Sequence, residues 1–509
     1  MTLIRPTLDQ LAASAESVGI VLERETLAQY AQILEATFRD YDEVDRLAPE
    51  QPAVRYPRTP GTVPAAHDNP LGAWHVQTRI EGAASGPLAG KTVVLKDNMC
   101  LAGVPMMNGS STLRGYVPDV DATVATRVLD AGGTIVGKAH CEFFCVSGSS
   151  HTSAAGPVRN PVNPAHSSGG SSSGCAALVG AGEVDMAIGT DQGGSVRIPA
   201  AYSGIVGMKP TWGLVPYTGI MPIEMTLDHA GPMTRTVADN ALLLQALAGP
   251  DGLDPRQQGH AAPRDYTSGL GQSCQGLRVA VVTEGFGWDN AEADVDAAVR
   301  QAGQTLRRLG AQVEAVSIPL HRLGHAIWAP IAVEGTTQLL KGFNYGSNWK
   351  GLYVTSLMRA QQDWTAHAAD FPHDLKTCLI AGEYFSRRYG GRYYAHAQNL
   401  ARRLRAAYDD VLSRFDALLM PTVPLKAPRL IDAQATPATF VTRALEMNAN
   451  TAPFDVTGHP AISVPCGYAD GLPIGAMLVG ADHTETTLYR LASALERTGA
   501  GARPEGARA

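Results

Sequence analysis

Three separated segments of the chain carry the residues best suited to covalent chemistry, a lysine and two serines. Lys96 lies in VLKDN, Ser171 in GGSSSG and Ser195 in DQGGSVRIPA. A serine hydroxyl is a weak nucleophile until a base removes its proton, and a lysine amine is one of the known bases for serine. The Gly/Ser segment also runs directly into an apolar helix candidate and then a strand, unlike a flexible linker. These residue types therefore favour nucleophilic chemistry by a serine.

A pair of glycines stands directly before Ser195. Glycine permits backbone angles and close approach that side chains forbid, so the amides of Gln192, Gly193, Gly194 and Ser195 could point at one oxygen. Such an arrangement is an oxyanion hole, in which each donor typically contributes about 3–4 kcal/mol to catalysis. We therefore expect these four residues to form one.

Taken together, the three segments resemble the amidase-signature family in their order and spacing, and the likeness covers about residues 71–500. The resemblance implies that Ser195 is the nucleophile, that Ser171 is a bridging serine with a cis peptide bond, and that Lys96 is the base. It implies hydrolysis of small carboxamides to a carboxylic acid and ammonia or an amine, through an acyl-enzyme on Ser195. No cofactor is expected.

Lysine can accept a proton only when it is uncharged, and burial in the apolar run before Lys96 would favour that form. The adjacent Asp97 would oppose it, so we expect this carboxylate to point away or to pair elsewhere. Asp191 and Arg197 also match the family motif, and we expect them to hold the loop rather than to touch substrate.

The chain departs from the family pattern at two positions. Ser173 stands where the family usually has glycine, and Cys175 where it often has serine. Neither change removes a proton carrier, but the added Ser173 side chain could reshape the base of the pocket.

Four further segments look most like bacterial amidases of nitrile-degradation pathways: VPMMNGS (104–110), SGSSHTSAAGPVRNP (147–161), KPTWGLVPYTG (209–219) and NTAPFDVTGHPAISVP (450–465). Such enzymes hydrolyse aliphatic and aromatic carboxamides, often enantioselectively, and an N-terminal helical segment helps them to dimerise. The resemblance implies a homodimer. Trp328 and Ile223 are candidates for an apolar wall of the acyl pocket, and Asn450 for a polar contact, although each suits a structural role equally.

Other site interpretations are weaker. Residues 170–174 match G-x-S-x-G, which would make Ser172 the nucleophile, but that motif needs a strand immediately before it. Residues 132–138 nearly spell a phosphate-binding loop, yet Ala139 occupies the Ser/Thr position. No fourth ligand follows His140, Cys141 and Cys145 at zinc spacing, so we predict no metal.

Three other functions stay open. The chain could be the A subunit of a glutamine-dependent amidotransferase, although the N-terminal helical addition disfavours this. It could be an esterase, an aryl-acylamidase or a hydrazidase of the same family. An inactive binding relative is disfavoured because Lys96, Ser171 and Ser195 are all intact.

Composition narrows the partners and the compartment. The 509 residues carry a net charge of −7, and their lysines and arginines form no basic stripe, so nucleic acid is not expected. Seven widely spaced cysteines argue against a disulfide framework and favour a reducing cytosol. No stretch approaches the ~18 apolar residues of a membrane span. We expect a soluble, cytoplasmic protein.

Short β-branched runs alternate with helical patterns, which predicts an α/β fold: a mixed, mostly parallel central sheet flanked by helices. The predicted strands are 92–95, 134–136, 186–189, 277–282, 313–318, 417–420, 461–464 and 476–479. The predicted domains are an N-terminal helical segment with a proline-rich connector (1–70), a catalytic domain (71–500) with a helix-rich insertion at about 320–445, and a flexible tail (501–509).

Overall fold

The computed structural model describes residues 3–257, 264–432 and 434–503. The chain divides into two compact units, Met1–Ala53 and Val54–Ala509. Residues 504–509 of the predicted tail lie outside the described residues.

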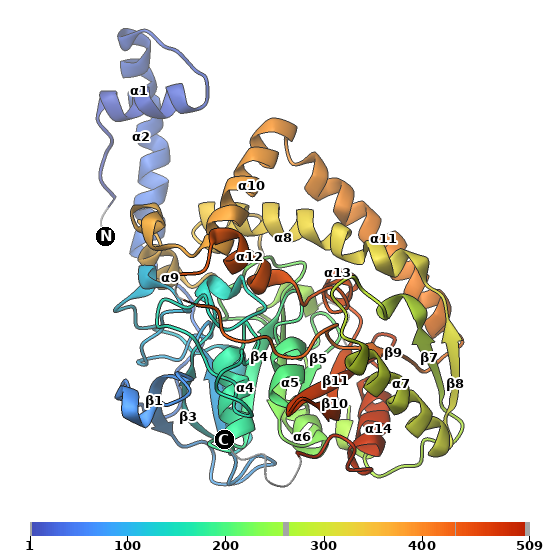
Figure 1. The fold of residues 1–509 in the computed structure, drawn as a ribbon. Coiled ribbons are helices and arrows are strands. Elements are labelled where there is room, and N and C mark those ends of the chain that lie inside the picture. Colours follow the sequence, from blue (N-terminus) through green and yellow to red (C-terminus); the bar gives the residue numbers. More distant parts are fainter. Residues whose placement is uncertain (1–2, 258–263, 433, 504–509) are drawn as a thin grey trace. The chain divides into compact units, whose positions relative to one another are not determined.

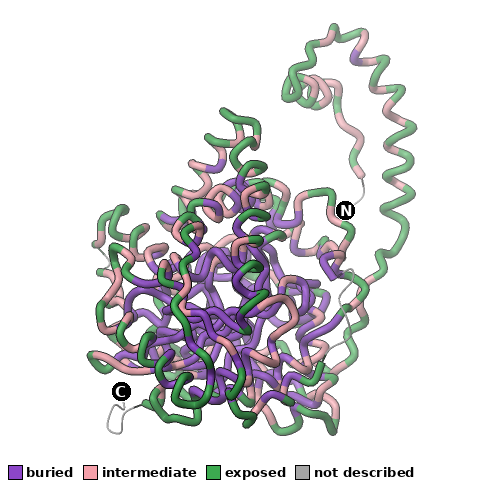
Figure 2. The backbone as a smooth tube through the Cα atoms, turned by 90° about the vertical axis from the view of Figure 1, so that its right-hand side faces the viewer, coloured by how far each residue is buried: buried purple, intermediate pink, exposed green. Residues whose placement is uncertain are grey.

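The first unit consists of two helices, α1 (Leu8–Ser17) and α2 (Arg24–Arg46). Thr7 caps α1 in a capping box with Gln10. Arg5 ties the preceding segment to α2 through ion pairs with Glu35 and Asp42. Most of α2 is exposed or half-buried, whereas buried residues concentrate in the second unit (Figure 2).

The second unit is built on one eleven-stranded sheet in the order β1-β3-β2-β4-β6-β5-β10-β11-β9-β7-β8. Its strands are β1 (Trp74–Ile80), β2 (Thr92–Lys96), β3 (Thr134–Ala139), β4 (Met186–Asp191), β5 (Val206–Lys209), β6 (His229–Thr234), β7 (Arg278–Val282), β8 (Gln312–Val316), β9 (Ala417–Pro421), β10 (Ala461–Ala469) and β11 (Leu472–Val479). The sheet is mixed, as predicted.

The expectation that most strands are parallel is wrong. Among the described strands, four neighbouring pairs are parallel and six are antiparallel. The sequence prediction lacked β1, β5 and β6, and each of these three strands pairs only in the antiparallel sense. Another antiparallel pair, β10 with β11, is a hairpin whose tight turn at Asp470 and Gly471 uses positive φ angles.

Helices flank this sheet (Figure 1). Against it pack α3 (Thr123–Asp130), α4 (Ser173–Ala181), α5 (Arg197–Ser203), α6 (Val237–Leu247), α7 (Ala293–Arg308) and α14 (Glu485–Glu496). The helix-rich stretch expected at about 320–445 contains α8 (Gly324–Lys341), α9 (Thr355–Ala360), α10 (His373–Tyr389), α11 (Arg392–Leu412) and α12 (Pro437–Leu445), and the short α13 (Ala452–Thr457) follows it.

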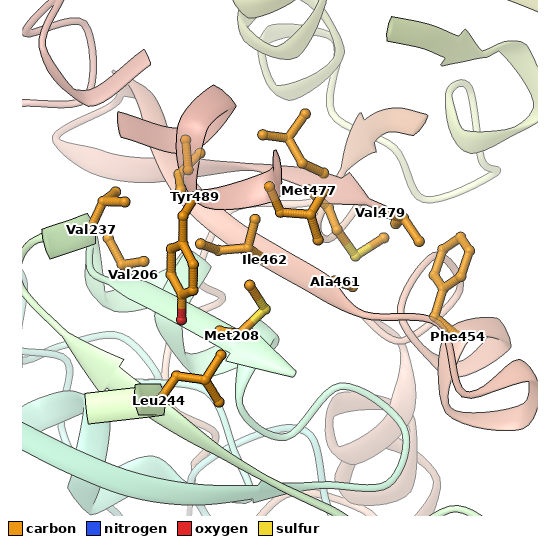
Figure 3. Packing of buried hydrophobic residues seen from close by; sticks show 14 of the residues in the cluster. Val206, Met208, Val237, Leu244, Phe454, Ala461, Ile462, Met477, Val479 and Tyr489 are labelled. Atoms are coloured by element: carbon orange, nitrogen blue, oxygen red, sulfur yellow. The ribbon is translucent and has the colours of Figure 1, made fainter. Parts of the chain in front are cut away.

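The main core lies between the sheet and its helices. Met208 of β5 and Ile462 of β10 pack near Leu244 of α6 and Tyr489 of α14 (Figure 3). The buried Tyr489 hydroxyl donates to Asn240 Oδ1 at 2.8 Å, so its one polar atom is satisfied. Among helices in the described part of the chain, none combines the length and apolar content needed to cross a bilayer.

Candidate active site

The last residue of β2 is Lys96, whose amine is completely buried. Parallel strands present their carboxyl ends at the same edge of a sheet, so the pairing of β2 with β4 brings Thr190 beside it. Lys96 Nζ lies 2.7 Å from Ser171 Oγ and 2.8 Å from Thr190 Oγ1. The lysine and the first serine, 75 residues apart, are therefore in direct contact.

Ser171 lies just before α4, and the Gly170–Ser171 peptide bond is cis. The next residue connects this segment to the third one, because the Ser172 amide donates to the Ser195 carbonyl at 3.3 Å. The Ser172 hydroxyl turns toward β4 instead, where it lies 3.2 Å from the Thr190 carbonyl. A loop rather than a strand precedes Ser172, so the G-x-S-x-G interpretation lacks its structural context.

Ser195 lies in the loop between β4 and α5 and lines a cavity of about 220 Å³. Neither Lys96 nor Ser171 is among the residues that line it. The Ser195 hydroxyl makes no hydrogen bond to any described residue. Among Lys96, Ser171 and Ser195, Ser195 is the residue that lines the cavity, and the buried Lys96–Ser171 pair adjoins it through the Ser172 amide.

A buried charge network holds the Ser195 loop. Both oxygens of Asp191 accept from Arg197, at 2.9 and 3.0 Å, and Arg197 also donates to Asp455 at 2.7 Å. Burial opposes ionisation of Asp191, but the neighbouring Arg197 outweighs it and holds the pKa of this carboxyl well below its usual range. The expectation that Asp191 and Arg197 hold the loop is confirmed.

The same network changes the expected oxyanion hole. The Gly194 amide donates to Asp191 Oδ1 at 2.6 Å, so it is already used. The amides of Gln192, Gly193 and Ser195 have no hydrogen-bond partner within the described part of the chain. Gly194 is nevertheless required as glycine, because its φ is +131° and a Cβ would lie 2.4 Å from Thr451 Oγ1.

Two side chains orient neighbouring peptide planes of this loop, one of which carries the free Gly193 amide and the other the Gly194 amide that is bound to Asp191. Trp328 Nε1 donates to the Gln192 carbonyl at 2.7 Å, and Thr451 Oγ1 donates to the Gly193 carbonyl at 2.6 Å. A carbonyl fixed on one side of a peptide plane fixes the direction of the neighbouring N–H.

Asp97 is paired away from Lys96, as expected. Its carboxylate lies 3.0 Å from Lys138 Nζ and accepts from the amides of Met107 and Asn108 at 2.9 and 2.8 Å. Lys138, the last residue of the near phosphate-loop match, is thereby a buried counter-ion on β3.

The two departures from the family pattern are both buried. Ser173 does not line the cavity; its hydroxyl donates to Glu142 Oε1 at 2.9 Å. Burial raises the pKa of Glu142 to about 7, and its other oxygen accepts from Thr152. Cys175 makes only a weak contact with the Ile188 carbonyl at 3.6 Å. Ser173 therefore holds the carboxylate of Glu142 close to the segment that contains the cis peptide bond, and it does not shape the cavity.

The three candidate pocket residues have different positions. Trp328 and Ile223 line the cavity with Ser195. Asn450 does not: its amide donates to the carbonyls of Gly285 and Pro421, and its oxygen accepts from Trp288 and contacts His321. All its polar groups are used to hold loops together, so we drop it as a substrate contact.

Cys141 and Cys145 both lie within hydrogen-bond range of Asn108 Oδ1, at 3.4 and 3.2 Å. Among the described residues, no group of three or more histidines, cysteines or carboxylates is arranged to hold a metal ion.

Sequence reasoning missed two parts of the site. Thr190 contacts Lys96 directly, and its position at the carboxyl end of β4 was an available signal. The cavity wall from α8 and α10 gave no such signal, because it comes from helices far along the chain: Ala332, Val333, Thr336, Asp374, Thr377, Cys378 and Ala381.

Comparison with known proteins gives a consistent family. The Amidase family model matches residues 71–489. An enantioselective amidase of Rhodococcus rhodochrous is 47% identical over 97% of this chain and 96% of its own length. The solved A subunit of the glutamyl-tRNA(Gln) amidotransferase of Thermotoga maritima is 30% identical, with a TM-score of 0.69 over 84% of this chain and 88% of its own. The peptide amidase of Stenotrophomonas maltophilia is 32% identical, with a TM-score of 0.66 over 82% and 84%. The chain therefore belongs to the amidase family.

Proposed function

We propose that this protein hydrolyses small carboxamides through an acyl-enzyme on Ser195, with Ser171 and Lys96 as its proton relay. The observation that carries the proposal is the 2.7 Å contact between the buried Lys96 amine and Ser171, in a segment that is hydrogen-bonded to the cavity-lining Ser195. Family membership supports the reaction class.

In the first half-reaction Ser195 Oγ attacks the amide carbonyl carbon. Its proton passes to Ser171, and the Ser171 proton passes to the uncharged Lys96 amine. When the tetrahedral intermediate collapses, the relay runs in reverse and protonates the leaving nitrogen, so that ammonia or an amine departs. A water molecule then attacks the acyl carbon and gives its proton to the same relay. The ester bond to Ser195 Oγ breaks, the relay returns the proton to this oxygen, and the carboxylic acid leaves.

The oxyanion of each tetrahedral intermediate would be held by the amides of Gln192, Gly193 and Ser195. Their lack of other partners in the described structure supports this role, as does the hydrogen bond from Trp328 to the Gln192 carbonyl, which orients the peptide plane of the Gly193 amide. Gly194 would serve by its conformation, because its own amide is bound to Asp191.

Trp328 and Ile223 would contact the acyl group. The cavity is small and mostly apolar, which favours compact aliphatic or aromatic acyl groups over long peptides. The enantioselective amidase relative supports the amide class.

The test is a substrate panel of amides, anilides, hydrazides and esters, with intact-mass detection of the acyl-enzyme. We expect an acyl adduct on Ser195, and none in Ser195→Ala.

The A subunit of an amidotransferase is the second candidate, favoured by the likeness to the Thermotoga protein. Release of ammonia from a simple carboxamide by the isolated chain at an ordinary enzymatic rate would exclude it, and an adduct on another residue would refute the mechanism.

We further propose a cytoplasmic homodimer formed through the first unit. Four large apolar side chains of α2 are exposed in the isolated chain, Tyr30, Ile33, Tyr41 and Val44, and all seven cysteines are free thiols. Light scattering on the full chain should give a dimer. The double variant Ile33→Lys with Val44→Lys should give a monomer, whereas Asp40→Asn on the same helix should not.

A further inference from the structure

One side chain of the cavity wall is chemically out of place. Asp374, the second residue of α10, lines the cavity that contains Ser195 and is only 1% exposed. Neither of its carboxylate oxygens makes a hydrogen bond of normal geometry to a described residue, and the backbone amides of Asp374 and Leu375 at the start of α10 are the groups that favour its ionised form. Its neighbour Thr377 donates to the Asp374 backbone carbonyl, not to the side chain.

A second carboxylate in the same wall shows what a structural role requires. Glu224 also lines the cavity, but one of its oxygens accepts from Tyr394 and the other from Thr226 and Leu227. Glu224 is therefore satisfied within the fold, whereas Asp374 is not.

An unpaired buried carboxylate is costly, because it loses hydration without gaining a partner. Burial raises the pKa of Asp374 to about 6, while the amides at the start of α10 favour its ionised form. At neutral pH the group is thus mainly an anion that can accept but not donate.

The surroundings of Asp374 make a cation the best complement. Among the cavity-lining residues of the described structure there are two carboxylates and no lysine, arginine or histidine. Much of the remaining wall is aliphatic and suits methylene groups: Ile198, Ile223, Leu227, Ala332, Val333 and Leu445.

We propose that Asp374 is a specificity-determining residue that binds an ammonium group carried by the substrate, so that the preferred substrates are small amino-bearing carboxamides. The amide would lie at Ser195, the ammonium at Asp374, and an aliphatic spacer between them. This inference rests on the proposed amide hydrolysis and adds a substrate class to it.

The test uses two matched series at pH 8. The first holds ω-amino carboxamides from 3-aminopropanamide to 6-aminohexanamide, and the second holds the methyl isosteres from butanamide to heptanamide. In the wild-type protein we expect at least one amino compound to exceed its isostere in kcat/KM by about tenfold or more, mainly through KM, the size of a hydrogen bond to a charged group.

The variant Asp374→Asn keeps the shape and removes the charge. We expect it to lower the ratio of kcat/KM between each amino compound and its methyl isostere to near one, a selective change that a general loss of structure would not produce. The control Asp363→Asn removes an exposed carboxylate outside the cavity and should leave both series unchanged.

A measurement on the wild type alone covers the case of a misfolded variant. n-Butylamine should compete with pentanamide far better than n-butanol does. An amino series that is never preferred at any length, equal inhibition by the amine and the alcohol, or a preference that survives in Asp374→Asn would each overturn the inference. Hydrolysis of the methyl isosteres without any amino effect would leave the proposed function standing, whereas absence of any amide hydrolysis would remove both.

Discussion

The buried charges on the two sides of one cavity differ in whether the fold supplies hydrogen-bond partners for them. On the nucleophile side, Asp191 and Arg197 are completely buried and satisfy each other through two hydrogen bonds, with backbone amides taking up the remaining capacity of the carboxylate. On the α10 side, Asp374 is almost as buried and has no partner in the described structure. The first arrangement fixes a loop in one geometry. The second leaves the carboxylate of Asp374 able to bind a group that comes from outside the chain.

The difference teaches where to look for a ligand. A buried charge that the fold satisfies acts on the fold, and removing it should cost stability. A buried charge that the fold leaves unsatisfied already costs stability, so removing it should increase stability while changing recognition. The following predictions test this contrast, in order of decreasing expected effect.

Replacing the nucleophile should have the largest effect. For Ser195→Ala we expect kcat/KM for a simple carboxamide to fall by at least about 10⁴-fold, since covalent catalysis is lost. Ser172→Ala is the matched control, because that hydroxyl contacts only β4, and it should cost less than about tenfold. Ammonia release measured under identical conditions decides the point; equal losses in the two variants would contradict the assignment.

Disrupting the buried network of Asp191, Arg197 and Asp455 should give the largest change in stability. Arg197→Leu leaves Asp191 and Asp455 buried without their cation, and should lower the free energy of unfolding by about 3–5 kcal/mol. The exposed pair of Arg414 with Asp410 provides the control: Arg414→Gln should cost less than about 1 kcal/mol. Urea unfolding followed by circular dichroism measures both, and similar values would show that burial does not matter here.

Removing the unsatisfied charge should have the opposite sign. The pKa of Asp374 is raised in the folded protein from 3.8 to about 6, so the native state binds its proton more tightly than the unfolded chain and loses stability as pH rises from about 4 to 6. Asp374→Asn should therefore stabilise the protein by about 2–3 kcal/mol at pH 7.

At pH 4 that gain should nearly vanish, because wild-type Asp374 is then protonated in the folded state. Thermal unfolding from pH 4 to 8 tests the trend. Glu142 interacts electrostatically with Asp374 and also titrates with a raised pKa, so the difference between variant and wild type is the quantity to follow. A variant that is less stable than wild type at pH 7 would indicate a partner for Asp374 within the fold.

The smallest effect should come from removing the hydrogen bond between Ser173 and Glu142. Ser173→Ala removes one of three hydrogen bonds to Glu142 and should cost about 1 kcal/mol of stability. Activity should change little, because Ser173 does not line the cavity. A selective loss of kcat with unchanged melting temperature would show that Ser173 acts on catalysis instead.

Much of the fold followed from local pattern. Eight of the strands lie where the alternation of β-branched runs and helical patterns predicts them, and the helix-rich stretch follows at its expected place. The strands β1, β5 and β6 escaped detection, and with them most of the antiparallel pairing, because neighbours in a sheet are chosen by long-range contacts.

The sequence by itself indicated the chemistry of Lys96, Ser171 and Ser195, since the order and spacing of the three segments resemble the amidase-signature family, and that resemblance implies a serine nucleophile with a lysine base. It also predicted that Asp97 would point away or pair elsewhere. A carboxylate beside the lysine amine would favour the charged form of that amine, which cannot accept a proton.

Tertiary structure alone decided which of the expected groups are free to act. It used the Gly194 amide for Asp191, engaged every polar atom of Asn450 in loop contacts, and brought Asp374 from a distant helix to the cavity of Ser195. The physical reason is that a hydrogen bond or a buried charge depends on what packs around it, and many of those neighbours are distant along the chain, such as Trp288 and Asn450, which are 162 residues apart.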